Sequence, residues 1–515
     1  MGRTLLATLL VALAVVTPAH AGWDDDGARA RRGLAAAVAA GYVPALDAQR
    51  YGASVTRSLV AIRRLPRDRA QNLGAVLRDV AAQSGRYTQP RALALFSMLD
   101  VNTRHLGNAP LPKPGTDVRD VDGVVYRAFA GRGLQFHPLG SFGKLNAEIV
   151  RGRNAQAHRL AFALLARAVP SGQSLVWEYY FRFNGGAPPW RSGMAQAVAA
   201  QALARGGFLV EARRAYLALP AGLLLPTSAG PWIRLYSFNS LTVLNAQLQT
   251  ALSVGEYALL AKDRGAAELA PRLEATAAGL LPLFDTGGWS RYALGGKEAA
   301  LDYHRYVVSL LERLANRPEG ESFRPWAVKF GAYLRLPPEL VAGPPGPAAY
   351  PQPADGHRDA ASVSFRLSKP ATITLFAAGE RRSASFGAGS GAIAWYPGNR
   401  PPGLYNARLR AVDIAGNATE VEAAPITVKR DTVAPEVSAH AEGRRLVWRG
   451  VDEGTPWLRL ALRLERAGQR KVIALGINRV SGSLRLRLPR GTWAGTLIAR
   501  DSSGNRSDVD LGKLH

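Results

Sequence analysis

Apolar positions recur at helical spacing through the first two thirds of the chain and at alternate positions in the last third. Ala and Leu at helical intervals predict three helices in an N-terminal region, at 33–48, 53–65 and 71–84. A short strand is predicted at 123–126. From 139 to 336 the helical spacing predicts eight more helices, at 144–148 onward, 154–168, 193–204, 209–218, 240–253, 267–280, 299–316 and 323–334. Because long aromatic loops separate these helices, we expect an α/α toroid, an incomplete barrel whose loops build a cleft at one end.

The pattern changes at 337–356, where seven prolines among small residues predict a stiff linker. Beyond the linker, strict alternation predicts strands, for example at 362–367 and 484–488. The segment 411–417, with the letters AVDIAGN, recurs 88 residues later as ARDSSGN at 499–505. One small β-sandwich fits each repeat. This D-x-x-G-N ending resembles bacterial immunoglobulin-like modules, here 357–430 and 431–515.

The first residues have the organisation of a signal peptide. A positive Arg3 precedes an apolar run at 4–16, and Ala19-His20-Ala21 supplies small residues at the required spacing, so cleavage is expected after Ala21. The run is too short for a membrane anchor. We therefore expect a secreted, bacterial protein of several domains: 1–21 signal peptide, 22–115 helical region, 116–336 toroid, 337–356 linker and the two β-modules.

Composition removes several classes of chemistry. The 515 residues include no Cys, which excludes disulfides, thiol catalysis and Cys-ligated metals. The net charge of +26 predicts attraction to polyanions, but the charge is spread along the chain, which argues against a nucleic-acid partner. No P-loop, HExxH or G-x-S-x-G motif is present, and the D-x-x-G-N segments lack the ligand ladder of an EF-hand. We expect no cofactor and no metal site.

Candidate chemistry lies in loop-to-helix transitions that combine Tyr, His and Arg. Two such segments stand out, F-D-T-G at 284–287 followed by Tyr292, and L-D-Y-H at 301–304. Upstream are L-Y at 235–236, V-L-N-A at 243–246 and G-M-A-Q at 193–196. In this order the segments resemble the C-terminal catalytic domain of D-glucuronyl C5-epimerases, over about residues 120–335.

The resemblance implies inversion of C5 in glucuronate residues of a polysaccharide, with catalytic roles for Tyr292 and Tyr303 and a role around Tyr236. Two positions depart from the family: Leu235 stands where animal epimerases have an acidic residue, and His137 stands where they have an aromatic residue. Because its ordinary pKa is near neutrality, His137 is also a candidate for proton transfer.

The residue types suit this chemistry, because C5 of a uronate carries a proton alpha to a carboxylate. Inversion needs a base on one face and an acid on the other, and tyrosines serve both roles when their pKa is lowered by neighbouring Arg. Arg also pairs with the substrate carboxylate. Expected substrate-binding residues are Arg291, Arg305, His304, Arg182, Trp190, Trp289 and Asn245.

Two alternatives remain open. A polysaccharide lyase begins with the same proton abstraction and then eliminates the 4-O substituent. A non-catalytic glycan- or wall-binding protein keeps the cleft but has lost the chemistry, which the Leu235 departure favours. The natural polymer and the oligomeric state do not follow from the sequence.

Overall fold

The structure, a computed structural model, describes residues 20–515. It divides into two compact units. The first comprises the chain up to 284 with 291–297 and 306–327, and the second comprises 285–290, 298–305 and 328–515. Among the described residues, no helix combines the length and the apolar character that a membrane crossing requires. Apart from its last two residues, the expected signal peptide lies outside the described part.

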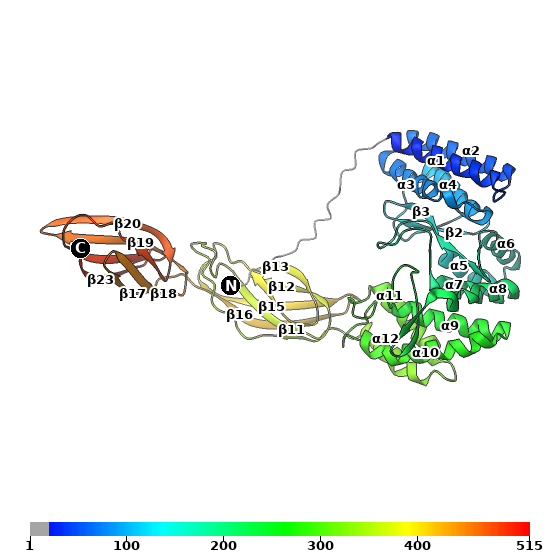
Figure 1. Ribbon diagram of the computed structural model, residues 1–515. Helices are drawn as coiled ribbons and strands as arrows, with labels where there is room; N and C mark the ends of the chain where they lie inside the picture. The colour runs from blue at the N-terminus through cyan, green and yellow to red at the C-terminus, as the bar shows by residue number, and fades with distance from the viewer. Residues whose placement is uncertain (1–19) are drawn as a thin grey trace. The chain divides into compact units, whose positions relative to one another are not determined.

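The first unit begins with four helices rather than the three predicted (Figure 1). They are α1 (His20–Ala39), α2 (Ala45–Arg64), α3 (Arg67–Ala82) and α4 (Gln89–Asn108). Helix α4 was not among the three predicted helices; it has Pro90 in its first turn, where the missing N–H costs nothing. Helix α1 packs on α2 and α3, and α4 packs on both of these.

A three-stranded antiparallel sheet follows, with the order β1 (Asp117–Arg119), β2 (Val125–Phe129) and β3 (Gly133–Phe136). Strand β3 packs against α3 and α4 (Figure 1). Buried Asn102 of α4 receives a hydrogen bond from Leu134 N at 2.8 Å and donates to Leu134 O at 2.7 Å. The N-terminal helices therefore fix the strand that leads to His137.

Eight helices follow the sheet, close to the predicted positions. They are α5 (Pro138–Val150), α6 (Asn154–Leu165), α7 (Gly193–Arg205), α8 (Leu209–Leu217), α9 (Leu244–Ala261), α10 (Arg264–Phe284), α11 (Leu301–Ala315) and α12 (Arg324–Tyr333). Within the first unit, α5 packs on α6 and α7, α7 on α8 and α9, and α9 on α10. Neighbours in sequence are thus neighbours in space, as a toroid requires; closure of a ring stays a prediction.

Three antiparallel hairpins lie between these helices. They are β4 (Val169–Ser171) with β5 (Ser174–Val176), β6 (Glu178–Tyr179) with β7 (Trp190–Arg191), and β8 (Leu224–Thr227) with β9 (Gly230–Ile233).

The last third forms two β-sandwiches, each of a three-stranded and a four-stranded antiparallel sheet. The first pairs β10-β11-β14 with β13-β12-β15-β16, and the second pairs β17-β18-β21 with β20-β19-β22-β23. Alternate residues of β11 and β12 point into the first core, around fully buried Trp395. The strand bounds are β10 (Leu340–Ala342), β11 (Ala361–Leu367), β12 (Ala371–Ala377), β13 (Glu380–Phe386), β14 (Gly389–Trp395), β15 (Gly403–Asp413), β16 (Ala418–Val428), β17 (Glu436–Glu442), β18 (Arg445–Val451), β19 (Trp457–Arg466), β20 (Gln469–Arg479), β21 (Gly482–Arg485), β22 (Trp493–Arg500) and β23 (Arg506–Leu514).

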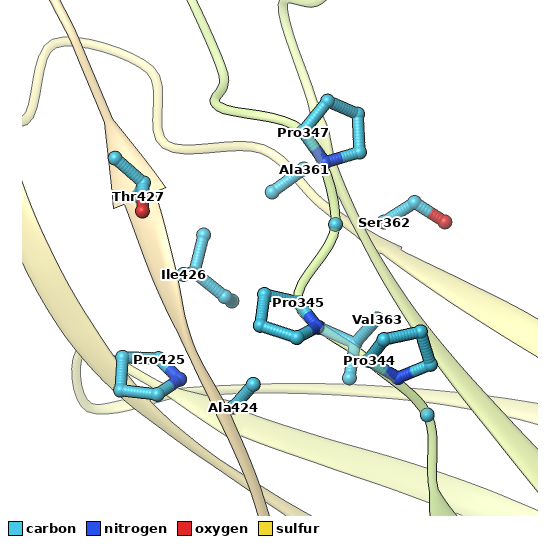
Figure 2. Close-up of a pocket in the computed structure, with 12 residues that line it drawn as sticks. Pro344, Pro345, Pro347, Ala361, Ser362, Val363, Ala424, Pro425, Ile426 and Thr427 are labelled. Carbon is cyan, nitrogen blue, oxygen red and sulfur yellow. The ribbon is translucent and has the colours of Figure 1, made fainter.

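The proline-rich segment 337–356 is not a free linker but an edge of the first sandwich. Within it, β10 pairs with β11, and Gly343 N donates to Ser364 O at 2.8 Å. Figure 2 shows its prolines along a narrow groove beside 361–363 and 424–427. Proline is compatible with an edge because it removes a donor that no neighbouring strand needs. This groove contains none of the candidate residues.

Candidate functional site

The loop between β6 and β7 forms an aromatic cluster in the first unit. The indole of Trp190 stacks on the ring of Tyr179, with centroids 4.1 Å apart and planes within 2°. Its Nε1 donates to Phe181 O at 2.8 Å, and only 4% of Trp190 is exposed. With one face covered and the N–H satisfied, Trp190 fills the interior of this loop.

Tyr236 lies at the border of these rings. We call Tyr179, Phe181, Phe183, Trp190 and Tyr236 together the Tyr236 cluster. The half-buried ring of Tyr236 is 5.6 Å from the ring of Trp190 and 5.5 Å from that of Phe183. Backbone bonds attach its segment to the start of α7, since Gly193 N donates to Arg234 O at 3.0 Å. A Cβ at residue 193 would lie 2.6 Å from this oxygen, which explains the glycine of the G-M-A-Q segment.

His137 is buried beside the same cluster, with its ring 5.8 Å from Tyr179. It is the N-cap of α5, where Nδ1 accepts a hydrogen bond from Gly140 N at 2.9 Å. Burial, with a smaller contribution from Arg127, lowers the pKa of His137 to about 3. The imidazole is therefore neutral at pH 7 and a weak base, which favours capping over proton transfer.

Tyr292 lies next to the N-terminus of α9. Its carbonyl oxygen accepts a hydrogen bond from Leu244 N at 3.3 Å, and Ala293 forms an antiparallel bridge with Val243. Tyr292 is half-buried, whereas Asn245, in the first turn of α9, is only 6% exposed. Backbone pairing thus brings together two segments that the sequence analysis singled out separately.

Arg291 precedes Tyr292 and is half-buried. Its guanidinium donates to Gly296 O at 2.8 Å, which uses one of its five N–H groups. The remaining donors leave it capable of a bidentate contact with a carboxylate.

In the second unit, adjacent residues of α11 have opposite environments. Tyr303 is 40% exposed, whereas His304 is fully buried. His304 Nδ1 lies 2.7 Å from Ser290 Oγ, its Nε2 lies 3.0 Å from Phe330 O, and its ring stacks on Trp289 at 3.8 Å. Since the carbonyl only accepts, Nε2 carries the proton and Nδ1 accepts from the hydroxyl.

Burial lowers the pKa of His304 to about 4, so the ring is neutral and both nitrogens are paired. A direct contact between His304 and a substrate would require one of these bonds to break. Trp289 is 2% exposed, and its Nε1 donates to Ala299 O at 2.7 Å. The substrate-binding role expected for Trp190 and Trp289 as sugar-stacking platforms is therefore wrong, because both rings are packed in the interior and present no face to a sugar.

The F-D-T-G segment forms a turn. Asp285 Oδ1 accepts from Gly287 N and from the Tyr333 hydroxyl, both at 2.9 Å, and Lys329 Nζ lies 2.5 Å from Oδ2. Gly287 has a φ of +87°, which favours glycine. Asp285 is thus a structural carboxylate.

Solvent-accessible candidates are therefore fewer than the sequence proposed. Tyr303, Arg305 and Arg182 are exposed, and Tyr236, Tyr292 and Arg291 are half-buried. The buried candidates are His137, His304, Asn245, Trp190 and Trp289.

Two buried glutamines hold these segments; Gln196 ends the G-M-A-Q segment, whereas Gln247 was not among the candidates named from the sequence. Gln247 of α9 accepts from Ile233 N at 2.8 Å and donates to Leu273 O at 2.9 Å. Gln196 of α7 accepts from Trp177 N at 3.0 Å and donates to Leu175 O at 2.9 Å. The sequence contains a signal for both residues, because a glutamine inside an otherwise apolar helix is expected to be buried. A buried amide then needs hydrogen-bond partners on neighbouring segments.

Comparison with known proteins bears on this region. Residues 171–331 match the model of a protein family, D-glucuronyl C5-epimerase C-terminus. The match covers about a third of the chain and contains every candidate except His137, and it supports a C5-epimerase-like function in general. No curated protein matches the chain.

Solved structures resemble parts of the chain only distantly. Fibronectin(III)-like modules of Clostridium thermocellum CbhA share 14% identity over 34% of this chain and 93% of theirs, with a TM-score of 0.16. Endo-beta-1,4-glucanase CMCax from Acetobacter xylinum shares 13% over 38% of this chain and 73% of its own, with a TM-score of 0.29. A Ca2+-stabilized adhesin of an Antarctic bacterium shares 17% over 30% and 43%, with a TM-score of 0.16. At such scores the β-sandwich assignment rests on the sheet topology alone.

Proposed function

We propose that this chain is a secreted C5-epimerase-like protein that acts on a uronate-containing polysaccharide. The observation that carries the proposal is the family match over 171–331, because it contains the three solvent-accessible candidate tyrosines, Tyr236, Tyr292 and Tyr303. The buried Tyr179, in the same segment, has a pKa raised by desolvation and is a poor base.

The reaction exchanges one proton and needs no redox partner. A phenolate oxygen removes the C5 proton, and the C–H electron pair moves into the carboxylate to give an enediolate. A phenol on the opposite face then donates its proton to C5, which inverts the centre. Each tyrosine afterwards exchanges its proton with solvent, so the atoms and charges balance.

Arginine stabilises the charge that develops on the carboxylate. Arg291, beside Tyr292, is half-buried and spends one donor on Gly296 O, and Arg305, two residues after Tyr303, is exposed, so both suit this role. A preorganised cation near the forming enediolate acts where charge increases, so it lowers the barrier and also binds the substrate. The net charge of +26 favours approach of an acidic polymer.

One observation favours a second candidate, a glycan-binding protein without catalysis. Leu235, at the position that is acidic in animal epimerases, is 8% exposed. No carboxylate is therefore available at this position to assist Tyr236.

Deuterium incorporation tests the proposal. The full-length mature chain is incubated with heparosan and related uronans in deuterated water, and C5 deuterium is read by NMR. We expect deuterium at C5 together with inverted residues. Tyr292→Phe and Tyr303→Phe should each lower exchange about 10²–10⁴-fold while binding is kept. Tyr42→Phe, at a 61% exposed tyrosine outside the matched segment, is the control.

Other outcomes contradict the epimerase proposal. Deuterium accompanied by unsaturated uronate ends identifies a lyase. Binding without exchange on any uronan identifies the non-catalytic protein.

A further inference from the structure

The two β-modules share one turn at the end of a central strand. In the first module Asp413 accepts from Asn417 N at 2.8 Å and from Asn417 Nδ2 at 3.0 Å. In the second, Asp501 accepts from Asn505 N and from Asn505 Nδ2, both at 2.8 Å. The repeated D-x-x-G-N letters therefore encode the same hydrogen-bonded loop.

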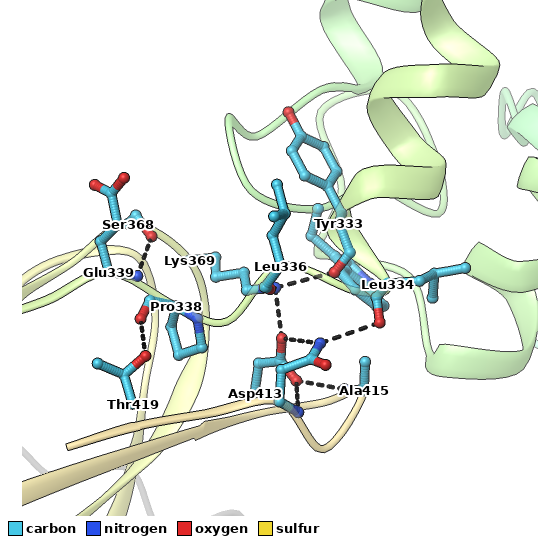
Figure 3. Close-up of polar contacts among 12 residues, drawn as sticks. Tyr333, Leu334, Leu336, Pro338, Glu339, Ser368, Lys369, Asp413, Ala415 and Thr419 are labelled. Atoms are coloured by element: carbon cyan, nitrogen blue, oxygen red, sulfur yellow. Dashed lines mark hydrogen bonds and ion pairs between the residues drawn. The ribbon is translucent and has the colours of Figure 1, made fainter.

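In the first module this loop faces a buried ammonium group (Figure 3). Lys369 is 3% exposed, and its Nζ donates to Tyr333 O at 3.0 Å and Leu336 O at 2.5 Å. It also lies 2.5 Å from Asp413 Oδ2. All three N–H groups of the ammonium thus have oxygen partners.

The entry segments of the two modules correspond residue by residue. Asn417 Nδ2 donates to Leu334 O at 3.1 Å, and Asn505 Nδ2 donates to Asp431 O at 3.3 Å. Thr419 Oγ1 donates to Pro338 O, and Ser507 Oγ donates likewise to Pro435 O. Leu334 therefore corresponds to Asp431, and Pro338 to Pro435.

The residue that corresponds to Lys369 carries no charge. Lys369 and Thr455 each precede a proline, and each lies two residues before its strand, β12 or β19. Thr455 cannot supply an ammonium group. The second module therefore lacks the tethered cation of the first, although Asp501 remains in the position of Asp413.

Three carboxylates lie at the corresponding place in the second module. One oxygen each from Asp431, Asp452 and Asp501 lies within 4.8 Å of the other two. Asp431 and Asp501 are 8% and 5% exposed. Within the described part of the chain, Asp431 Oδ2 is buried without any hydrogen-bond partner. A Cβ at residue 454 would collide with this oxygen, so Gly454 keeps the space beside it open.

Electrostatics make this group costly without a cation. Carboxylates at this spacing repel one another, and burial of Asp431 and Asp501 removes the water that would screen them. An unpaired buried carboxylate oxygen has lost its hydration, and a bound cation compensates for that loss.

We propose that Asp431, Asp452 and Asp501 bind Ca²⁺ at the entry of the second β-module, where the first module uses the ammonium of Lys369. The ligands are all oxygens, as hard cations require, and they lie within 4.8 Å of one another, so a small inward rotation of the side chains brings them to the roughly 2.3–2.6 Å at which oxygens bind one Ca²⁺. Backbone carbonyls and water complete the coordination of such sites. The site is independent of the proposed enzymatic function, and it replaces our sequence-based expectation of no metal ligand cluster.

Calorimetric titration of the EDTA-treated full chain with CaCl₂ tests the site. We expect one ion per chain with a Kd of about 10⁻⁴–10⁻³ M, the range of extracellular calcium modules. Amide hydrogen exchange should slow with Ca²⁺ in peptides covering 429–434, 451–456 and 500–505.

Two variants and a control locate the ion. Asp431→Asn removes the carboxylate without breaking a protein bond to Oδ2, so it should fold and weaken Ca²⁺ binding about tenfold or more. Thr455→Lys should supply the ammonium of the first module and make these peptides insensitive to Ca²⁺. Glu436→Gln, at an exposed acidic residue of β17, should bind as the parent does.

The proposal is overturned by no binding up to about 10 mM Ca²⁺. It is equally overturned if Asp431→Asn binds as tightly as the parent chain, because the ion then lies elsewhere. Should Thr455→Lys not fold, Asp431→Asn alone decides.

Discussion

Replacement of Lys369 by methionine should selectively destabilise the first β-module. The side chain keeps its length, so the packing of the aliphatic stem is largely retained. Three charged hydrogen bonds are lost, however, and Asp413, which is 5% exposed, remains buried without its counter-ion. Breaking a buried ion pair from one side costs about 3–5 kcal/mol.

Native-state hydrogen exchange measures this loss locally, which matters in a chain with several domains. At 1.36 kcal/mol per tenfold change, a loss of 3–5 kcal/mol lowers protection factors by about two to three and a half orders of magnitude. We expect this fall in peptides from β12 and β15. Peptides from β19 and β22 of the second module should exchange as in the parent chain.

The double variant Lys369→Met/Asp413→Asn separates ion pairing from packing. Because the second change removes the unpaired charge, the double variant should be more stable than Lys369→Met alone. Strictly additive losses, or a loss below about 1 kcal/mol in the single variant, would show that the Lys369–Asp413 pair does not stabilise the first module. It would then also no longer follow that Asp501 of the second module needs a cation in place of Lys369.

Three further predictions concern the first unit. Burial raises the pKa of Asp79 to about 7, above its value in the unfolded chain, so the free energy of unfolding should fall as the pH rises from about 4 to 7. Thermal melts should show this fall, and Asp79→Asn should abolish it. His137→Asn should retain the α5 cap and stability, whereas His137→Ala should cost about 1 kcal/mol in denaturant unfolding; equal losses would contradict a capping role. Arg91→Met should cost about 3–5 kcal/mol because it strands the carboxylate of Glu178, which is 2% exposed; unchanged near-ultraviolet circular dichroism and unfolding would contradict this.

Much of the secondary structure follows from local patterns. Helices α6, α7, α8 and α12 begin within one residue of the predicted positions, because their apolar stripes and start signals lie within the helix itself. The repeated D-x-x-G-N letters also located the two β-modules. They are a local signal, since an Asp and an Asn four residues apart close the turn without contacts from other segments. Strand β10 was missed because its neighbouring prolines give the same composition to a linker and to a sheet edge.

Burial decides what the sequence left open in the candidate site. Tyr303 and His304 are adjacent candidates, the first catalytic and the second substrate-binding, but one is exposed and the other has both nitrogens paired. Trp190 and Trp289 lie in loops, as sugar platforms do, yet both are enclosed. The carboxylates of the proposed Ca²⁺ site come from three separate turns, so no local spacing indicated them.

The N-terminal helices explain why the family-matched segment has the form seen here. Bidentate bonds at 2.8 and 3.0 Å join Arg91 of α4 to Glu178 of β6, the strand that also carries Tyr179. From the same helix, Asn102 holds β3, which leads to His137 beside Tyr179. One helix outside the matched residues 171–331 therefore fixes β6, whose Tyr179 stacks on Trp190, and the strand that precedes His137. Since the geometry of the Tyr236 cluster depends on contacts made by residues 89–108, we infer that 171–331 is part of a larger folding unit and not an autonomous domain.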